Sequence, residues 1–448
     1  MFTKNNSQMR MSDASLKDKI VFTLIILFFI QVFSNIPAPG INREILATFL
    51  NSDTSNAFSI FTMFSGNAFS QMSIFVIGIT PYISASIVMQ LLRVVIPSLE
   101  EMSKDGKTGQ DRFKKITYIV AGILAVIQTI PVTLGFASYG LLIKNDMFHI
   151  ASVAGSLIVG SIIEITLGNV IDKKGIGNGI SLILLINILS RFPNDIRVII
   201  EMFITGKGFK GLFGTIVICG VAIVFTLIGI IYLQDGEKRI KTQYSSQVKG
   251  QKGLYGVANN FIPMKVNMAG VMPIIFTSSM FQMYILIITL LKVPQDSIWM
   301  KISSFLSSSN WFQWNISIYN LGFIIYCLLI FMFSYFYSTL VFDPEEIADN
   351  LRKQGAVVVG IRPGKPTEEY LNQKLKTLRN VGSICLIIST SIPMIVSALF
   401  NVSGLSFGGT SIIIVVGVIL ETYKAIEAEK LENKTSSFLF TNFRKEKV

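Results

Sequence analysis

The chain has 448 residues, of which 51% are hydrophobic and only 15% charged, with a net charge of +12 and a mean hydropathy of +0.58. Soluble domains carry about 25% charged residues, so this composition excludes a soluble protein and indicates several membrane spans. With three cysteines and one histidine, His149, the chain has too few of these residues for a disulfide scaffold, a zinc hydrolase or a histidine-based catalytic triad.

Ten apolar segments predict ten transmembrane helices, because only helices and closed barrels satisfy backbone polar groups in lipid. The first is followed by 36–41, which is not a small-residue cleavage site, so we interpret it as a retained span rather than a signal peptide. The segments are 20–36, 73–97, 116–143, 150–171, 176–190, 212–233, 268–291, 316–342, 381–402 and 407–423.

The distribution of Lys and Arg predicts the orientation of the chain. Thirty of the 39 basic residues fall on one set of alternate loops and tails and eight on the other. Because basic residues are retained on the cytoplasmic side, both termini are expected in the cytoplasm. Topology alone accounts for this basic face, although attraction of anionic lipid or an acidic partner is the alternative explanation.

The long cytoplasmic loop 344–380 carries the signals of a folded unit. Asp343 stands at an N-cap position before Pro and Glu, which predicts a helix that Gly355 ends. A β-prone run, 356–361, and a turn, 362–364, precede a second helix. We expect an ordered basic knob that docks to a cytosolic partner, or a folded loop without one.

Two segments share a pattern that predicts an internal repeat. Gly, Pro, Ile and Ser recur at a constant offset of 192 residues between 78–86 and 270–278. The two segments lie five spans apart, so the copies run in opposite directions through the membrane. Paired Gly/Pro-interrupted helices in inverted halves indicate a pathway at the interface between the halves. Common helix-bending requirements are the alternative explanation.

The segment 58–69 is apolar but too short to cross a bilayer, and Ser65, Gly66 and Asn67 interrupt it. Irregular backbone at membrane depth is tolerated only inside protein or beside water. The segment is therefore either a mobile stopper in a pathway or a packed surface helix.

The spans contain few polar groups of the kind that an ion-coupled carrier needs. Glu164 is the clear mid-membrane carboxylate, and a single buried Glu also fits a protonated or hydrogen-bonded structural role. A small-solute secondary transporter built on an inverted repeat is therefore the second hypothesis. A structural membrane scaffold is the third, although it would not need paired broken helices.

Six stretches within 16–429 share a pattern with a known family, and they are 36–40, 78–90, 174–181, 265–270, 360–364 and 407–411. In their order and spacing, these stretches resemble the SecY family of protein-conducting channels, the central subunit of the general secretion translocon. The resemblance implies an all-α polytopic protein, a clamshell of ten transmembrane helices in two inverted five-helix halves. The expected divisions are a cytoplasmic tail 1–19, a first half 20–190 with a plug 58–69, an external hinge 191–211, a second half 212–423 with cytoplasmic loops 235–265 and 344–380, and a cytoplasmic tail 424–448.

The resemblance also assigns residues to the parts of such a channel. Arg362 matches an arginine that contacts the cytosolic motor or ribosome in the family. The aliphatic pore ring is expected at Ile79, Ile83, Ile180, Leu184, Ile275 and Ile414. The plug is expected to include Phe58, Ile60, Phe61, Met63, Phe64 and Gly66. The polar lining of the lateral gate is expected at Ser86, Gln128 and Thr277, and partner docking at Lys249, Lys252, Arg362 and Lys365.

The function implied is a conduit that passes unfolded secretory polypeptides across the membrane and releases transmembrane segments sideways into lipid. No catalytic residue, metal or cofactor is expected, because a partner motor ATPase or the ribosome supplies the energy. The expected partners are small SecE-type and SecG-type membrane subunits, the SecA motor ATPase, the ribosome, signal-sequence-bearing polypeptides and lipid. The expected location is the inner cell membrane.

Four positions depart from the family pattern or leave it open. Asn169 stands where relatives often have Glu, and Glu164 stands where an apolar residue is expected. Arg93 is unusual so close to a span, and the last ring position could be Ile413 instead of Ile414. These departures affect local packing rather than the family assignment.

Overall fold

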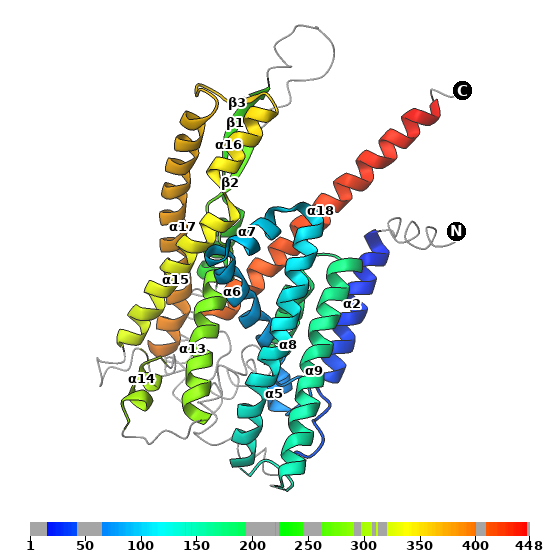
Figure 1. Cartoon of the computed structure of the whole chain (residues 1–448), viewed down its shortest axis with the longest axis vertical. Helices are drawn as coiled ribbons and strands as arrows, with labels where there is room; N and C mark the ends of the chain where they lie inside the picture. Colours follow the sequence, from blue (N-terminus) through cyan, green and yellow to red (C-terminus); the bar gives the residue numbers. More distant parts are fainter. Residues whose placement is uncertain are drawn as a thin grey trace.

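The computed structural model of the chain describes residues 16–42, 65–138, 140–144, 146–193, 220, 224–244, 261–290, 297–306, 311, 320–399 and 409–445. These residues form a bundle of long helices that carries a small sheet at one end, with helix α18 crossing the bundle obliquely (Figure 1). Each of the ten predicted apolar segments coincides with a helix in these ranges.

Among the described residues, the first half contains seven helices. The second half contains six, together with a helical segment Val224–Asp235. Those of the first half are α2 (Leu16–Phe33), α5 (Asn67–Ser70), α6 (Thr80–Val95), α7 (Pro97–Lys104), α8 (Gly106–Ser138), α9 (Met147–Lys174) and α10 (Gly179–Ser190). Those of the second half are α13 (Met272–Leu290), α14 (Ile298–Leu306), α15 (Asn320–Val341), α16 (Pro344–Lys353), α17 (Lys365–Leu399) and α18 (Gly409–Lys445).

The helices differ in length in a way that bears on their role. Four helical stretches of the described chain, within α8, α9, α15–α16 and α17, are long and apolar enough to span a membrane. A fifth candidate span combines α6 and α7, which are bent by 105° at Ile96. In contrast, α10 has only 12 residues, about 18 Å at 1.5 Å per residue, and cannot cross a bilayer by itself.

The two long loops 235–265 and 344–380 contribute a small sheet to an otherwise helical chain, in agreement with the predicted fold class. A three-stranded antiparallel sheet has the order β2-β1-β3, with strands β1 (Glu237–Tyr244), β2 (Phe261–Lys265) and β3 (Ala356–Val358). The predicted β-prone run after Gly355 contains β3, whereas β1 and β2 were not predicted. Ile240, Met264 and Val358 are buried together with residues of α16 and α17, so the sheet and these helices form one core.

The predicted limits of α16 are confirmed by its capping contacts. Asp343 Oδ1 accepts hydrogen bonds from the backbone N–H groups of Glu345 at 3.1 Å and Glu346 at 3.4 Å, which satisfies donors that the helix leaves unpaired. The helix ends at Lys353, and Gly355 follows its last turn. The loop 344–380 is therefore an ordered projection continuous with α17.

The largest apolar core joins both halves of the bundle. It contains Ile30 of α2, Ile183 of α10, Ile330 of α15 and Ile413 of α18, each between 0 and 1% exposed. Since residues from the first and last spans share this core, the two halves meet over a continuous apolar surface. A closed pathway between the halves would be filled by such apolar side chains.

Candidate functional site

The two repeat segments adopt the same local structure at the centre of the bundle. Gly78 has φ +59° and Gly270 has φ +62°, a left-handed conformation that favours glycine. Helix α6 begins two residues after Gly78, at Thr80, and α13 begins two residues after Gly270, at Met272. The repeat predicted from the sequence is therefore a repeated left-handed turn two residues before the start of each helix.

A side chain holds each turn, from α9 for Gly78 and from the preceding residues of the same segment for Gly270. Ser161 Oγ of α9 donates to the carbonyl oxygen of Gly78 at 2.9 Å, and Asn267 Nδ2 donates to that of Gly270 at 2.8 Å. A methyl group added at Gly78 would lie 3.5 Å from Glu164 Oε2, and one added at Gly270 would lie 3.6 Å from Glu421 Oε1. A carboxylate of the chain thus lies beside each interrupted helix start, where the positive end of the helix dipole favours negative charge.

All six residues predicted for the pore ring are buried in the core shared by the two halves, at 0 to 8% exposed. They come from both interrupted helices, from α10 and from α18. The same core also holds many apolar residues outside the ring, including Ile413 at 1% beside Ile414 at 0%. Burial therefore agrees with a closed apolar constriction but does not single out its members.

The helices that carry the residues predicted for the lateral gate, α6, α8 and α13, are in contact. Gln128 of α8 donates through Nε2 to Ser84 Oγ of α6 at 3.2 Å and to Met283 Sδ of α13 at 3.4 Å. Thr277 donates its hydroxyl to Pro273 O of its own helix at 2.8 Å. Of the predicted gate residues, Gln128 therefore bridges the two halves, whereas the Thr277 hydroxyl bonds within α13.

A second cross-gate contact involves a residue that the sequence did not indicate. The Tyr337 hydroxyl of α15 donates to Gln90 Oε1 of α6, and Gln90 Nε2 is 3.2 Å from Ser86 Oγ. The Tyr337 ring also packs edge-on against Phe276 of α13, with centroids 5.2 Å apart. The predicted residue Ser86 is thus linked through Gln90 to a contact between the two halves.

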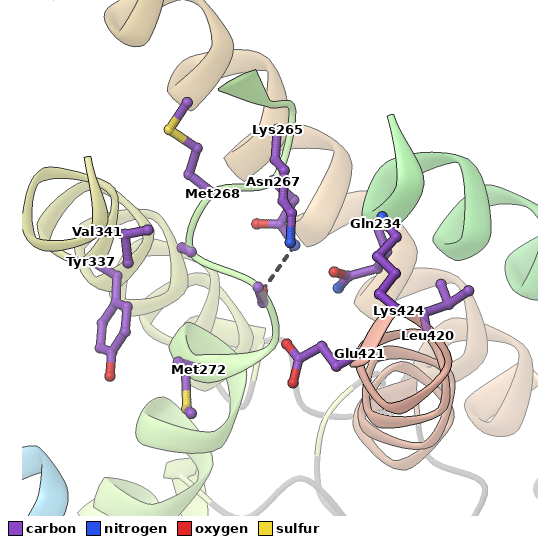
Figure 2. A pocket seen from close by; sticks show the side chains of 13 residues that line it. Gln234, Lys265, Asn267, Met268, Met272, Tyr337, Val341, Leu420, Glu421 and Lys424 are labelled. Atoms are coloured by element: carbon purple, nitrogen blue, oxygen red, sulfur yellow. Dashed lines mark hydrogen bonds between the residues drawn. The ribbon is translucent and has the colours of Figure 1, made fainter. Parts of the chain in front are cut away.

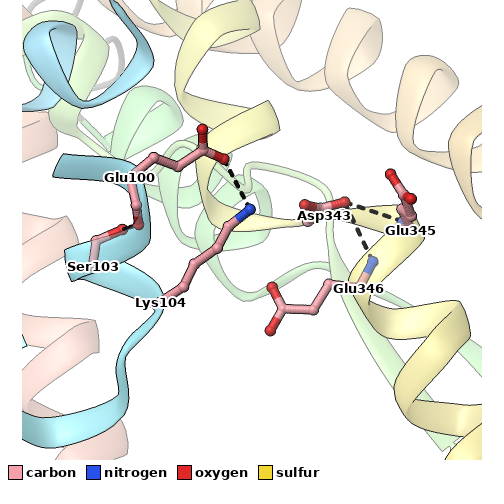
Figure 3. A network of polar contacts seen from close by, with 6 residues as sticks. All are labelled: Glu100, Ser103, Lys104, Asp343, Glu345 and Glu346. Carbon is pink, nitrogen blue, oxygen red and sulfur yellow. Dashed lines mark hydrogen bonds and ion pairs between the residues drawn. The ribbon is translucent and has the colours of Figure 1, made fainter. Parts of the chain in front are cut away.

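A polar network lies where α7 approaches the start of α16 (Figure 3). Lys104 Nζ lies 2.8 Å from Glu100 Oε1, and its side chain points toward the acidic cap of α16. The hydrogen bond that Lys104 donates to Glu100 raises the pKa of Lys104, with smaller contributions from the charges of Asp343 and Glu346. The ion pair itself lies within α7, and the acidic residues at the start of α16 act on Lys104 only through their charge.

A cavity of about 190 Å³ opens beside the second repeated turn (Figure 2). Its lining comes from the β2–α13 connection, α15, α18 and the end of the segment Val224–Asp235. Glu421 and Lys265 line it, and Lys424 is paired with Asp235 at 2.8 Å. The charges in the cavity are of both signs, so it is not selective for an ion of one sign.

The described part of the expected plug is its end. Phe58, Ile60, Phe61, Met63 and Phe64 lie outside the described residues. Gly66 packs so closely on α10 that a methyl group there would be 2.1 Å from the carbonyl oxygen of Asn187. The backbone N–H of Asn67 donates to Ser190 Oγ at 3.0 Å. Helix α5 is therefore docked on the last turn of α10.

The residues expected to dock partners are only partly described. Arg362 and Lys365 are both exposed, at the turn between β3 and α17. The Thr367 hydroxyl donates to Arg362 O at 2.8 Å and fixes that turn. Lys249 and Lys252 lie outside the described residues. The described docking residues therefore lie on a rigid, basic and accessible turn.

Comparisons with known proteins agree with this arrangement. A family model described as SecY matches residues 73–423. A protein translocase subunit SecY of Corynebacterium glutamicum is 34% identical over 448 residues, covering 95% of this chain and 98% of the relative. A solved structure described as a protein conducting channel has a TM-score of 0.66 at 18% identity, covering 93% of both chains. Sec61 in a canine ribosome-channel complex from the endoplasmic reticulum has a TM-score of 0.63 at 18% identity, also covering 93% of both.

Proposed function

This chain belongs to the SecY family, and from that premise we propose how its geometry conducts polypeptides. It is a multi-pass membrane protein and a protein-conducting channel. The observation that carries the mechanism is the pair of repeated turns at Gly78 and Gly270, which precede the starts of two helices that share one apolar core. Unfolded secretory polypeptides pass along this interface, and apolar segments leave it sideways into lipid.

The closed pore is sealed by apolar side chains rather than by charge or by specific hydrogen bonds. We place the ring at the six predicted residues, Ile79, Ile83, Ile180, Leu184, Ile275 and Ile414, because all are buried where the halves meet. An apolar constriction excludes ions by dewetting. It also accepts any sequence, since it makes no sequence-specific bond with the polypeptide that passes.

The segment 58–69 is proposed as the plug. Its described end, from Ser65 to Phe69, is docked on α10, and Ala68 belongs to the same apolar core as the ring residues. Displacement of this segment would remove one barrier and leave the ring as the remaining seal of the pore. The plug therefore adds a second barrier to the resting channel.

The lateral gate lies between α6 and α8 of the first half and α13 and α15 of the second. The contacts of Gln128 with Met283 and of Tyr337 with Gln90 cross this boundary. An apolar segment of about 20 residues gains a few tenths of a kcal/mol for each central Leu, Ile, Phe or Val that enters lipid, while each charge costs about 3 kcal/mol. When the halves separate at this boundary, a segment enters the lipid if its apolar residues outweigh the free-energy cost of its charges.

The pore supplies no energy, so the driving ATPase or ribosome is a separate partner, and the family is a channel family rather than an enzyme family. We propose that the turn of Arg362 and Lys365 docks the motor or ribosome, with Lys249 and Lys252 contributing. The canine Sec61 structure is itself a ribosome-channel complex. We further propose that the chain assembles with small subunits of the SecE and SecG types. We also propose that it lies in the inner cell membrane with both termini in the cytoplasm.

A small-solute transporter is not favoured. Such carriers use the starts of discontinuous helices to bind anionic substrates and keep coupling groups at the midplane. Here the chain's own Glu164 and Glu421 lie beside the starts of α6 and α13. The positions that would hold an anionic solute are thus already beside carboxyl groups of the chain.

Reconstitution tests the proposed function. The purified chain and any small subunits that co-purify are placed in vesicles with a motor ATPase, ATP and a precursor protein. Protection of the precursor from added protease is the expected result. A stable monomer that takes up a solute and protects no precursor would contradict the proposal.

A further inference from the structure

One buried carboxylate, Glu164, has no part in the pore ring, the gate or the docking turn. It lies in the middle of α9 and is 0% exposed. A buried carboxylate costs several kcal/mol unless its oxygens are paired. Its partners therefore indicate what the residue does.

One oxygen of Glu164 is paired across helices. Asn187 Nδ2 of α10 donates to Glu164 Oε1 at 3.2 Å, and Asn187 is itself 3% exposed. This is a buried side-chain contact between two membrane helices. It fixes the orientation of the Asn187 amide at the end of α10.

The other oxygen, Oε2, lies beside the first repeated turn. It has no hydrogen-bond partner among the described residues and is 3.5 Å from where a methyl group on Gly78 would be. Ser161, one helical turn earlier on α9, donates to Gly78 O at 2.9 Å. The same face of α9 therefore contacts the turn that starts α6 and the end of α10.

The end of α10 is where α5 is docked. Ser190 Oγ accepts from the Asn67 N–H at 3.0 Å and donates to Asn187 O at 2.7 Å. Gly66 packs directly against the Asn187 carbonyl. The backbone of Asn187 thus holds α5, while its side chain is held by Glu164.

From these contacts we infer that Glu164 is a positioning residue that couples the seat of α5 to the turn that begins α6. The inference rests on the proposed function, because α5 is the described end of the proposed plug. Loss of the Glu164 acceptor removes this buried hydrogen bond, so the last turn of α10 reorients and α5 is released. Release of α5 and a shift of the Gly78 turn then occur together.

The test measures the seat of α5 directly. Ala68 is 1% exposed, so a cysteine introduced by Ala68→Cys, in a chain whose three native cysteines are replaced by alanine, reacts slowly with a membrane-impermeant maleimide while α5 is docked. Glu164→Leu and Asn187→Leu are each expected to increase the reaction rate about five- to tenfold, the effect of one lost buried hydrogen bond. Resting ion conductance in planar bilayers is expected to rise in parallel.

Three further variants separate a specific bond from general damage. Glu164→Gln keeps an acceptor for Asn187 and is expected to stay within about twofold of wild type. The double variant Glu164→Leu with Asn187→Leu removes both polar partners and is expected to be less reactive than either single variant. Thr166→Val, on the same helix but with a hydroxyl bonded only to Ile162 O at 2.7 Å, is the control and is expected to change nothing.

Each outcome decides between the inference and its alternatives. Unchanged maleimide rates in both single leucine variants would overturn the coupling, and so would equal damage from Glu164→Gln and Glu164→Leu. The proposed function is tested independently by Ile275→Asn, which should raise conductance whatever happens at Glu164. If Ile275→Asn and deletion of 58–69 also leave conductance unchanged, the proposed function is contradicted, independently of the coupling through Glu164.

Discussion

The Tyr337 hydroxyl donates a hydrogen bond to Gln90 Oε1, and these residues are separated by 247 positions in the chain. Tyr337 is 7% exposed, so the bond is buried where α15 of the second half meets α6 of the first. It is one of the contacts that must break when the two halves separate at the gate.

Tyr337→Phe is predicted to favour the open gate. The ring retains its packing on Phe276, while Gln90 Oε1 loses its donor. Side-chain hydrogen bonds between membrane helices contribute about 1 kcal/mol, so the open fraction is expected to rise about fivefold. Export of precursors with weakened signal sequences measures this change. Tyr335→Phe, the same change on the exposed face of α15, is the control and should behave like wild type.

Gln128→Leu is predicted to have the opposite effect. Gln128 is 3% exposed, and its Oε1 has no hydrogen-bond partner among the described residues. Leucine fills a similar volume without a buried polar atom, which stabilises the closed contact with α13. Export of weak-signal precursors should fall several-fold, while precursors with strong signals are affected less. Faster export of weak-signal precursors would contradict the gate assignment of Gln128.

Ile275→Asn is predicted to destabilise the closed pore. A fully buried isoleucine contributes about 1.5 to 3 kcal/mol, and an unpaired buried amide costs a further few kcal/mol. The open population should rise roughly tenfold for each 1.4 kcal/mol of shift. Resting ion leak and export of weak-signal precursors should both increase, whereas Ile275→Leu should resemble wild type. If neither property changes in Ile275→Asn, this side chain does not line the pore.

Deletion of 58–69 is predicted to increase ion leakage without abolishing transport, because the apolar ring still closes around a polypeptide. Single-channel conductance in planar bilayers measures the leak. A matched deletion in the tail 424–448 is the control for loss of chain length. Unchanged conductance would show that the segment is a packed surface piece rather than a plug.

Arg362→Glu is predicted to leave membrane insertion of the channel intact while strongly reducing precursor export. Charge reversal on the exposed turn creates repulsion with an acidic partner surface. Vesicles with motor and ATP measure export. Lys374→Glu, a charge reversal further along α17, is the comparison. Wild-type export rates in Arg362→Glu would contradict the docking assignment.

Local signals in the sequence predicted the parts of the structure that depend on neighbouring residues. Asp343 predicted the start of α16 and Gly355 its end, because capping involves residues within one helical turn. Gly78 and Gly270 predicted the repeated interruption, since a left-handed turn before a Pro-containing helix start is also a local feature. The ten apolar segments predicted the helices of the bundle for the same reason.

The contacts between distant segments could not be predicted in this way. Strand β1 is mostly polar and exposed, so its sequence lacks the apolar alternation of a half-buried strand. Its partner β2 begins only at Phe261, which is too far along the chain for a local hairpin signal. Tyr337 is one of several aromatic residues in an apolar span, so the sequence does not indicate its contact with the other half. The sequence shows Glu164 as a carboxylate within a span but does not indicate Asn187 as its partner. Such pairings depend on which faces of the helices meet.

The shortness of the central helices has a consequence for the water around a polypeptide in transit. Helix α6 has 16 residues and α10 has 12, about 24 Å and 18 Å, against a hydrocarbon thickness of about 30 Å. The dry part of the path is therefore thinner than the bilayer. An extended chain advances about 3.3 Å per residue, so only a few residues are dehydrated at once, and a charged residue sheds its hydration shell over a short distance rather than across the whole membrane.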